Sequence, residues 1–134
     1  MEDTEKAYLA GIIDGEGTVT LSRRKPNQTP SPNVSVSNSN LPMLRWIKNN
    51  VGGCISTKKR YQSHHRQTYV WALSYDKALS LLRKIEKYLI IKKPQAKLIL
   101  EEYKASTIRT GKYTKELLKK KMKLVARIRE LNQR

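Results

Sequence analysis

The chain has 134 residues, enough for one domain with its own hydrophobic core, and it carries a formal net charge of +17 from 28 Lys and Arg against 11 Asp and Glu. So much positive charge predicts a polyanionic partner, with nucleic acid as the first expectation and an anionic membrane surface as the second. The single cysteine, Cys54, excludes an internal disulfide and a cysteine zinc cluster, and no apolar run approaches the roughly 20 residues of a membrane-spanning helix. Residues 1–134 are therefore predicted to form a single domain. The N-terminus lacks the basic start and apolar core of a secretory signal, so an intracellular protein is expected, in the cytoplasm of a bacterium or phage host or in an organelle.

The first predicted element is a helix over about residues 4–14. Leu9, Ile12 and Ile13 recur there at the three- and four-residue spacing of an apolar helix face. This pattern predicts a helix that packs against the rest of the domain.

Two glycines and two acids make the end of this helix unusual. Gly11 and Gly15 lie four positions apart, so they share one helix face and leave a strip on which another backbone can approach closely. Asp14 and Glu16 lie at the C-terminal end, where the helix dipole disfavours carboxylates. Two interpretations are open: a capped core helix whose acids pair with nearby lysines, or a helix packed on a twin so that each delivers one carboxylate to a shared metal site.

Beyond this helix, the hydrophobic pattern predicts two strand pairs separated by a helix. Alternating apolar and polar residues predict strands at residues 18–24, 33–38, 54–60 and 67–74. Apolar stripes predict further helices at about residues 40–51, 76–88, 95–106 and 114–132. The predicted fold class is α+β, with an αββαββα core, a four-stranded antiparallel sheet whose apolar face packs on helices, and additional C-terminal helices.

The other face of this sheet is predicted to bind DNA. No Asp or Glu occurs between Gly17 and Tyr75, whereas the same span holds nine Lys and Arg. A sheet or a two-stranded ribbon can enter the major groove and read base edges with short polar and basic side chains. The outward positions of the alternation nominate Thr20, Ser22, Arg24, Asn33, Ser35, Ser37, Ser56, Lys58, Arg60, Arg66 and Thr68.

Two other polar clusters have less specific patterns. His64 and His65 are neighbours at a predicted hairpin tip, where we expect surface or DNA-backbone contacts rather than a metal pair or a general base. The last predicted helix has a basic face that would bind DNA phosphates, contact a partner or, as the expected role, remain solvated. That face consists of Lys115, Lys119, Lys120, Lys123, Arg127 and Arg129.

Residues 9–17, LAGIIDGEG, resemble the nine-residue signature of the LAGLIDADG homing endonucleases. They differ by Ile at the fourth letter, Gly at the seventh and Glu at the eighth. The predicted order of elements over residues 4–90 is similar to that of the family, and residues 88–98 (YLIIKKPQAKL) look like its segment leading into the later helices. The resemblance implies a saddle-shaped sheet on a long DNA site, with an active site at the bottom of two paired signature helices.

The resemblance also implies roles for individual residues. Glu16 matches the catalytic, metal-binding acid, with the Gly15 carbonyl as a second ligand. Asp14 matches the acid that is structural at the helix end. Lys92 matches the basic residue near the scissile phosphate, and its neighbour Lys93 is the alternative assignment.

One copy of the signature predicts a homodimer on a near-palindromic DNA site. Asn40 matches a polar residue that orders active-site water in the family. The predicted dimer interface consists of Leu9, Gly11, Ile12 and Gly15.

The implied function is a site-specific double-strand DNA endonuclease, a homing endonuclease or meganuclease of the kind associated with intron homing. It would hydrolyse phosphodiester bonds with Mg²⁺ or another divalent ion such as Mn²⁺. The alternative is a non-catalytic nucleic-acid-binding protein on the same fold, either an intron-splicing maturase or a DNA-binding regulator. A basic RNA-binding or ribosome-associated protein is a third alternative, which leaves the glycine strip and the acid pair without an explanation.

Overall fold

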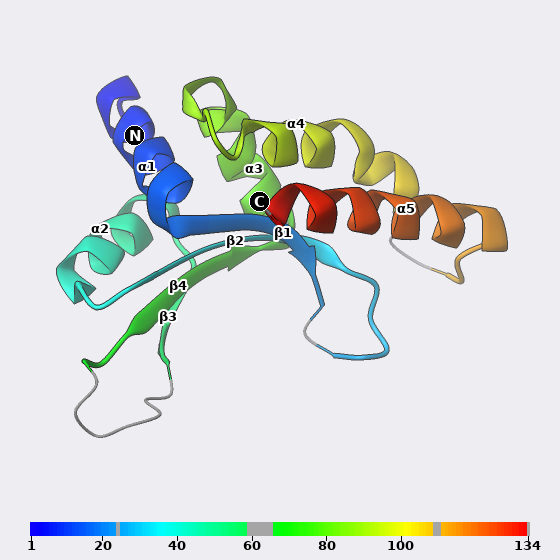
Figure 1. The fold of residues 1–134 in the computed structure, drawn as a ribbon, viewed down its shortest axis with the longest axis horizontal. Helices are drawn as coiled ribbons and strands as arrows, with labels where there is room; N and C mark the ends of the chain where they lie inside the picture. The colour runs from blue at the N-terminus through cyan, green and yellow to red at the C-terminus, as the bar shows by residue number, and fades with distance from the viewer. Residues whose placement is uncertain (24, 59–65, 109–110, 134) are drawn as a thin grey trace.

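The computed structural model describes residues 1–23, 25–58, 66–108 and 111–133, and the elements and contacts given below lie within them. Figure 1 shows that the helices lie on one side of a curved sheet, whose other side is free of helices. The elements in chain order are α1 (Asp3–Glu16), β1 (Gly17–Ser22), β2 (Ser31–Asn38), α2 (Leu41–Val51), β3 (Cys54–Thr57), β4 (Tyr69–Ser74), α3 (Tyr75–Ile85), α4 (Lys93–Glu102) and α5 (Lys115–Asn132). Two short 3-10 helices, η1 (Glu86–Tyr88) and η2 (Lys104–Ser106), precede α4 and α5.

The sheet has the strand order β1-β2-β4-β3, and all neighbouring strands run antiparallel. Two hairpins therefore meet along the central β2–β4 pair, where Val36 lies opposite Trp71. Val19 lies opposite Val34 in the first hairpin, so apolar residues face each other across all of these strands. The predicted α+β class and the four-stranded antiparallel sheet are confirmed.

One face of the sheet and the helices above it form a single core. Trp71 is the largest fully buried side chain, and its indole Nε1–H donates a 2.8 Å hydrogen bond to the carbonyl of Gly52. This bond satisfies the one polar atom of the ring. Gly53 follows with a φ of +93°, and a Cβ at that position would lie 2.6 Å from the carbonyl oxygen of Ala72. Only glycine fits where the chain passes this closely over the sheet.

Several element boundaries differ from the prediction by a few residues, including the ends of α3 at Ile85 and of α4 at Glu102 rather than at residues 88 and 106. Three further differences concern the site and the sheet. Helix α1 continues past the predicted end at Asp14 to Glu16, because the Gly17 N–H closes the last turn on the Ile13 carbonyl. Strand β2 begins at Ser31, since its first two residues pair with β1 before the β4 pairing starts, and a proline is tolerated at such a one-sided position. Strand β3 ends at Thr57, and the predicted strand residues 59–60 lie outside the described residues.

Candidate active site and nucleic-acid interface

Asp14 is committed to the backbone of the segment that leads into α4. Its Oδ2 accepts a 2.8 Å hydrogen bond from the N–H of Ile90, and its Oδ1 accepts a 2.9 Å bond from the N–H of Lys92. Both bonds are charge-assisted, and charge-assisted bonds are about twice as strong as neutral ones. The carboxylate thus ties residues 90–92 to the last turns of α1, which offsets its unfavourable place on the helix dipole.

Replacing Asp14 by Asn is expected to destabilise the fold. An amide leaves one oxygen as an acceptor and turns an NH₂ group toward a backbone N–H, so at least one of the two bonds is lost at a cost of about 1.5–3 kcal/mol. Urea unfolding followed by circular dichroism measures this change. Asp3→Asn is the matched control, since that side chain is 77% exposed and its Lys6 contact spans 3.7 Å. An unchanged unfolding midpoint for Asp14→Asn would contradict the structural role.

Glu16, in contrast, has an exposed carboxylate at the very end of α1. Its Oε2 accepts a short hydrogen bond from the Nδ2 of Asn38, at the end of β2. Within the described residues neither Glu16 nor Asp14 forms an ion pair, so the interpretation in which these acids pair with lysines is not supported. The carbonyl of Gly15 lies in the same last turn, where helix carbonyls have no intrahelical partner.

Asn38, rather than Asn40, is the amide that contacts this acid. Asn40 caps α2, because its side-chain oxygen accepts a 3.1 Å bond from the Met43 N–H. Its own N–H donates to the Oδ1 of Asn38 at 2.8 Å, which fixes the orientation of the Asn38 amide toward Glu16. The pairing of β1 with β2 explains why Asn38 contacts Glu16. Gly17 lies opposite Val36, so the last two residues of β2 lie alongside the end of α1.

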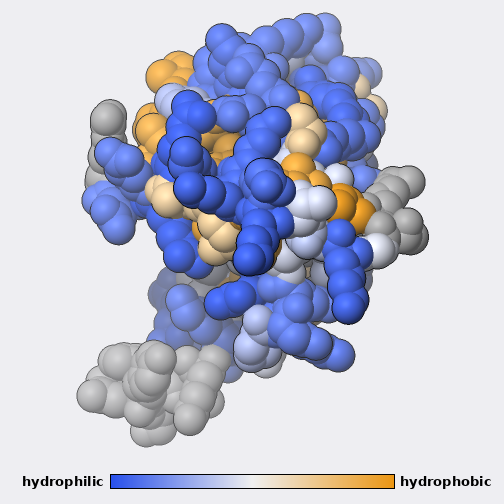
Figure 2. Space-filling view, turned by 90° about the vertical axis from the view of Figure 1, so that its right-hand side faces the viewer, coloured by the Kyte–Doolittle hydropathy of each residue, from blue (hydrophilic) through white to orange (hydrophobic). Residues whose placement is uncertain are grey.

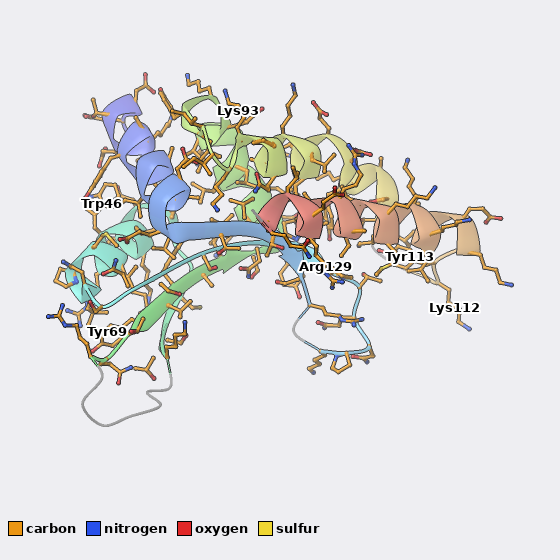
Figure 3. The ribbon with its side chains drawn as sticks, viewed as in Figure 1. Trp46, Tyr69, Lys93, Lys112, Tyr113 and Arg129 are labelled. Atoms are coloured by element: carbon orange, nitrogen blue, oxygen red, sulfur yellow. The ribbon has the colours of Figure 1, made fainter. Side chains whose placement is uncertain are left out.

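Lys92 is half-buried and lies at the N-cap of α4, with its backbone held by Asp14. The alternative, Lys93, is the first residue of α4, and Figure 3 shows it on the helix side of the molecule. Of the two lysines, Lys92 is the one bonded to the signature helix. The role of Lys92 as the basic residue near the scissile phosphate stays a prediction.

The glycines of the signature helix have different surroundings within the chain. A Cβ at Gly17 would lie 2.8 Å from the Ile13 Cα and 3.0 Å from the Ser35 carbonyl oxygen, so the α1–β1 junction requires a glycine. A Cβ at Gly11 or Gly15 would meet no atom within 4 Å. Packing inside one chain explains Gly17 and leaves the other two unexplained.

An apolar surface surrounds this open glycine strip. Tyr8 is 54% exposed, and the centroid of its ring lies 5.2 Å from that of Trp46 of α2, which is partly buried. Ile90 and Ile91, held beside α1 by Asp14, are 81% and 62% exposed. Ile12 is half-buried on the same side of the helix as Gly11.

Leu9 does not belong to this surface. Its side chain is fully buried with Ala10 and Ile13 in the core of the chain itself. The prediction that Leu9 lies in a dimer interface is therefore wrong. The remaining predicted interface residues are Gly11, Ile12 and Gly15, all of which are at least partly exposed.

The free face of the sheet carries the predicted DNA-reading side chains. Thr20 lies opposite Asn33, whose Nδ2 donates a 3.0 Å bond to the Oγ of Ser74. Ser37 and Ser56 flank Val70 on the same face. Of the predicted DNA-binding residues that the structure describes, five are exposed: Ser22, Ser37, Ser56, Lys58 and Arg66. Four are half-buried: Thr20, Asn33, Ser35 and Thr68. Arg24, Arg60, His64 and His65 lie outside the described residues.

The basic face of α5 is a separate surface, on the helix side of the sheet. All six predicted residues are exposed, and Figure 2 shows this end of the molecule covered mostly by hydrophilic side chains. Arg127 pairs with Glu102 of α4 at 2.9 Å, so part of this face contributes to helix packing. Neither α5 nor any other helix in the described part of the chain is long and apolar enough to cross a bilayer.

The comparison with known families decides what the signature means. The family model of the LAGLIDADG endonucleases matches residues 9–100, more than half of the sequence. The chain belongs to the LAGLIDADG endonuclease family. None of the curated protein sequences matches it.

Solved structures with the same fold are LAGLIDADG homing endonucleases. The archaeal intron-encoded homing endonuclease I-Vdi141I, solved in complex with DNA, has a TM-score of 0.76 at 24% identity, over 98% of this chain and 86% of that one. I-CvuI, solved with its target and calcium, has a TM-score of 0.69 at 21% identity, over 96% and 82%. I-CeuI, solved with DNA, has a TM-score of 0.56 at 18% identity, over 78% and 57%. At these identities the likeness shows the shared fold.

Proposed function

We propose that this LAGLIDADG protein is a site-specific double-strand DNA endonuclease that acts as a homodimer and uses Mg²⁺ or another divalent ion such as Mn²⁺. The observation that carries the proposal is the exposed Glu16 carboxylate at the end of α1, directly beside an open glycine strip. I-CvuI was solved with DNA in the presence of magnesium and of calcium, and I-Vdi141I was solved with DNA. These relatives support a divalent ion and a DNA substrate for the same fold.

The sheet supports DNA as the partner. No Asp or Glu belongs to β1–β4 or to the segments that join them, so the face opposite the helices has no carboxylate of its own to repel phosphates. Arg23, Lys25, Lys58 and Arg66 are exposed where the strands end. Small side chains between these cations leave room for base edges to approach the strands.

The glycine strip supports a homodimer. No group of three or more His, Cys, Asp or Glu side chains gathers within the described residues, so one chain offers Glu16 alone where hydrolysis with paired metal ions needs several oxygen ligands. Two α1 helices that cross at Gly11 and Gly15 would bring two Glu16 carboxylates together across a two-fold axis. The exposed Ile90 and Ile91 would be buried on the same side. A two-fold dimer reads a palindromic or nearly palindromic target.

The residues at the end of α1 suit a hard divalent ion. The Glu16 carboxylate and the Gly15 carbonyl are the oxygen donors that would hold Mg²⁺ or Mn²⁺. When bound, such an ion supplies Lewis acidity and lowers the pKa of a coordinated water. Asn38 orients the Glu16 carboxylate, and Asp14 holds the Lys92 backbone nearby. The Lys92 ammonium adds a positive charge that stabilises the extra negative charge of the phosphate transition state.

A selection from a randomised DNA library tests this function. The protein is incubated with the library in Mg²⁺, in Mn²⁺ and in Ca²⁺, and cleaved and bound fractions are sequenced. We expect cleavage of near-palindromic sites in Mg²⁺ and Mn²⁺, and binding of the same sites in Ca²⁺. Specific binding without cleavage in any of these ions would overturn the nuclease assignment and identify a non-catalytic regulator or maturase.

A further inference from the structure

One lysine of α5 lies on the buried side of that helix. Lys121 is fully buried, and it is not one of the six basic residues that the sequence assigns to the outer face of this helix. Its Nζ donates to the Tyr113 Oη at 2.9 Å, the Thr107 Oγ1 at 3.2 Å and the Thr29 Oγ1 at 3.3 Å. The same ammonium lies 4.7 Å from the centre of the Tyr103 ring and 5.2 Å from that of Tyr113.

These contacts form a site built for an ammonium ion. A lysine ammonium has three donors, and three hydroxyl oxygens accept from it. Two aromatic rings add cation–π attraction. Burial raises the pKa of the Tyr113 phenol, but hydrogen bonds from Lys121 and Thr29 outweigh burial, so the net pKa is lowered. An apolar side chain would fill this position without the desolvation cost of a buried charge, so stability alone does not explain the lysine.

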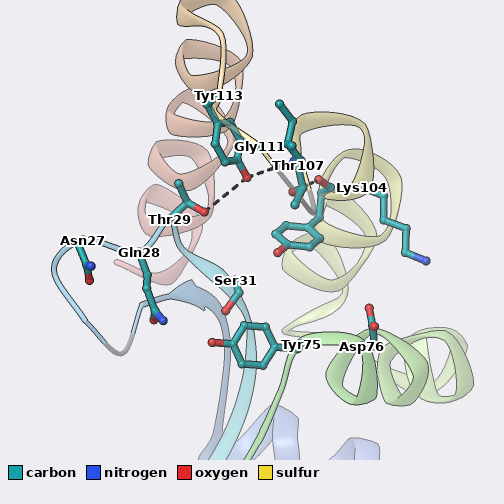
Figure 4. A pocket seen from close by; sticks show the side chains of 12 residues that line it. Asn27, Gln28, Thr29, Ser31, Tyr75, Asp76, Lys104, Thr107, Gly111 and Tyr113 are labelled. Carbon is teal, nitrogen blue, oxygen red and sulfur yellow. Dashed lines mark hydrogen bonds between the residues drawn. The ribbon is translucent and has the colours of Figure 1, made fainter.

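The three hydroxyls come from parts of the chain that are far apart in sequence. Thr107 and Tyr113 belong to the connection between η2 and α5, whereas Thr29 belongs to the connection between β1 and β2 (Figure 4). The Thr29 and Tyr113 hydroxyls also contact each other at 3.5 Å. Both residues line a groove of about 920 Å³ that lies between the two connections. Asp76 and Lys104 both line the same groove, whereas the hydroxyls bond inward to Lys121.

A second contact fixes the other end of the same hairpin to α5. The Nδ2 of Asn132 donates a 3.1 Å bond to the carbonyl of Val19, and its Oδ1 accepts a 3.0 Å bond from Gln95 of α4. The helix therefore holds the β1–β2 hairpin at β1 through Asn132 and at the hairpin connection through Lys121. Pairing with β4 fixes β2 from Asn33 to Asn38, so the hairpin connection beyond Ser31 is the part whose position depends on the contact with Lys121.

We propose that Lys121 is a positioning residue that sets the position of the outer end of the β1–β2 hairpin and thereby the base preference of the protein at the outer part of its DNA half-site. The inference rests on the proposed DNA-binding function. Strand β1 leaves α1 at Gly17, next to the expected two-fold axis, and Thr29 lies beyond the far end of that strand. The connection held by Lys121 therefore approaches the outer base pairs, and the α1 end approaches the central ones.

The test compares Lys121→Met and Thr29→Val with Lys123→Met, which removes an exposed lysine two positions further along α5. Methionine fills the buried space without a charge, and Thr29→Val removes only the hairpin's hydroxyl. Hydrogen exchange of residues 25–31 is measured in the free protein, and base preference is measured by sequencing library molecules bound in Ca²⁺. We expect exchange to rise about tenfold in both test variants, as for a locally opened segment. We also expect outer positions to lose about tenfold in discrimination, with central positions unchanged.

The outcomes separate the inference from the function on which it rests. Exchange and outer-position preference equal to those of Lys123→Met would overturn the positioning role. A loss of preference spread evenly over all positions would also overturn it, because that result indicates general destabilisation. If the unaltered protein selects no DNA sequence, the proposed function fails, and the exchange measurement still decides whether Lys121 holds the hairpin.

Discussion

Replacing Glu16 by Gln is expected to abolish DNA cleavage while folding and DNA binding persist. The side chain is exposed and its one described hydrogen bond is to Asn38, so the amide costs little stability. A neutral amide, however, binds Mg²⁺ or Mn²⁺ poorly, because these ions prefer anionic oxygen ligands. Since even residues that only support a metal ligand typically contribute 10–100-fold, we expect the cleavage rate to fall by at least about 100-fold.

Cleavage of a selected target in Mg²⁺ and binding of the same target in Ca²⁺ measure the two effects separately. Asp14→Asn serves as the contrasting variant, since it removes a charge of the same sign two residues away but acts on backbone N–H groups. It should lower the unfolding midpoint, whereas Glu16→Gln should leave that midpoint unchanged. Cleavage by Glu16→Gln at the unaltered rate would remove Glu16 from the catalytic site.

Asn38→Ala should lower the cleavage rate by less than Glu16→Gln does, because it frees the Glu16 carboxylate without removing it.

The contact between Asn38 and Glu16 could not be predicted from the sequence alone. The alternation in residues 33–38 predicts the strand, but the contact with Glu16 depends on the register between β1 and β2. Asn40 matches the family pattern by position, yet its side chain caps α2. The match by position therefore selected Asn40, whereas the amide that contacts Glu16 is that of Asn38.

The apolar pattern of α5 indicates that Lys121 is unusual. Leu124, Val125 and Ile128 are buried along one stripe of the helix, which begins at the half-buried Leu117. Lys121 occupies the position four residues after Leu117 and four before Val125. A lysine within an apolar stripe predicts either a snorkelling side chain or a buried one with polar partners. The partners are hydroxyls on two distant connections, which the sequence alone does not bring together.

The signature helix α1 is apolar on two faces, so its sequence does not show which face packs within the chain. Leu9 and Ile13 form its core face, whereas Tyr8 and Ile12 lie on a neighbouring side and border the same surface hollow as Gly11. Apolar periodicity predicts the helix but does not distinguish the face that packs within the chain from one that packs on a partner. The open space at Gly11 and Gly15 makes that distinction, and only the folded structure shows this space.

Replacing Gly11 by Leu is expected to convert the proposed homodimer into a folded monomer that does not cleave DNA. Within one chain the new side chain meets open space, and leucine favours a helix over glycine by somewhat under 1 kcal/mol, so the unfolding midpoint should hold or rise. At a two-fold axis each helix presents the added side chain to the other. Overpacking costs about 1–3 kcal/mol for each insertion, so two insertions cost at least about 2 kcal/mol and weaken dimerisation by at least about 30-fold.

Analytical ultracentrifugation over a concentration series measures dimerisation, and cleavage of the selected target measures activity. Gly17→Ala is the matched control within the same helix-to-strand unit. Its added Cβ would lie 2.8 Å from the Ile13 Cα, so it should destabilise the fold and have no specific effect on the dimer. The two glycines therefore predict opposite results: a stable monomer for Gly11→Leu and a less stable dimer for Gly17→Ala. A Gly11→Leu protein that stays dimeric and cleaves would show that the two chains meet elsewhere. In that case two Glu16 carboxylates would not meet across this strip, and the metal site would need other ligands.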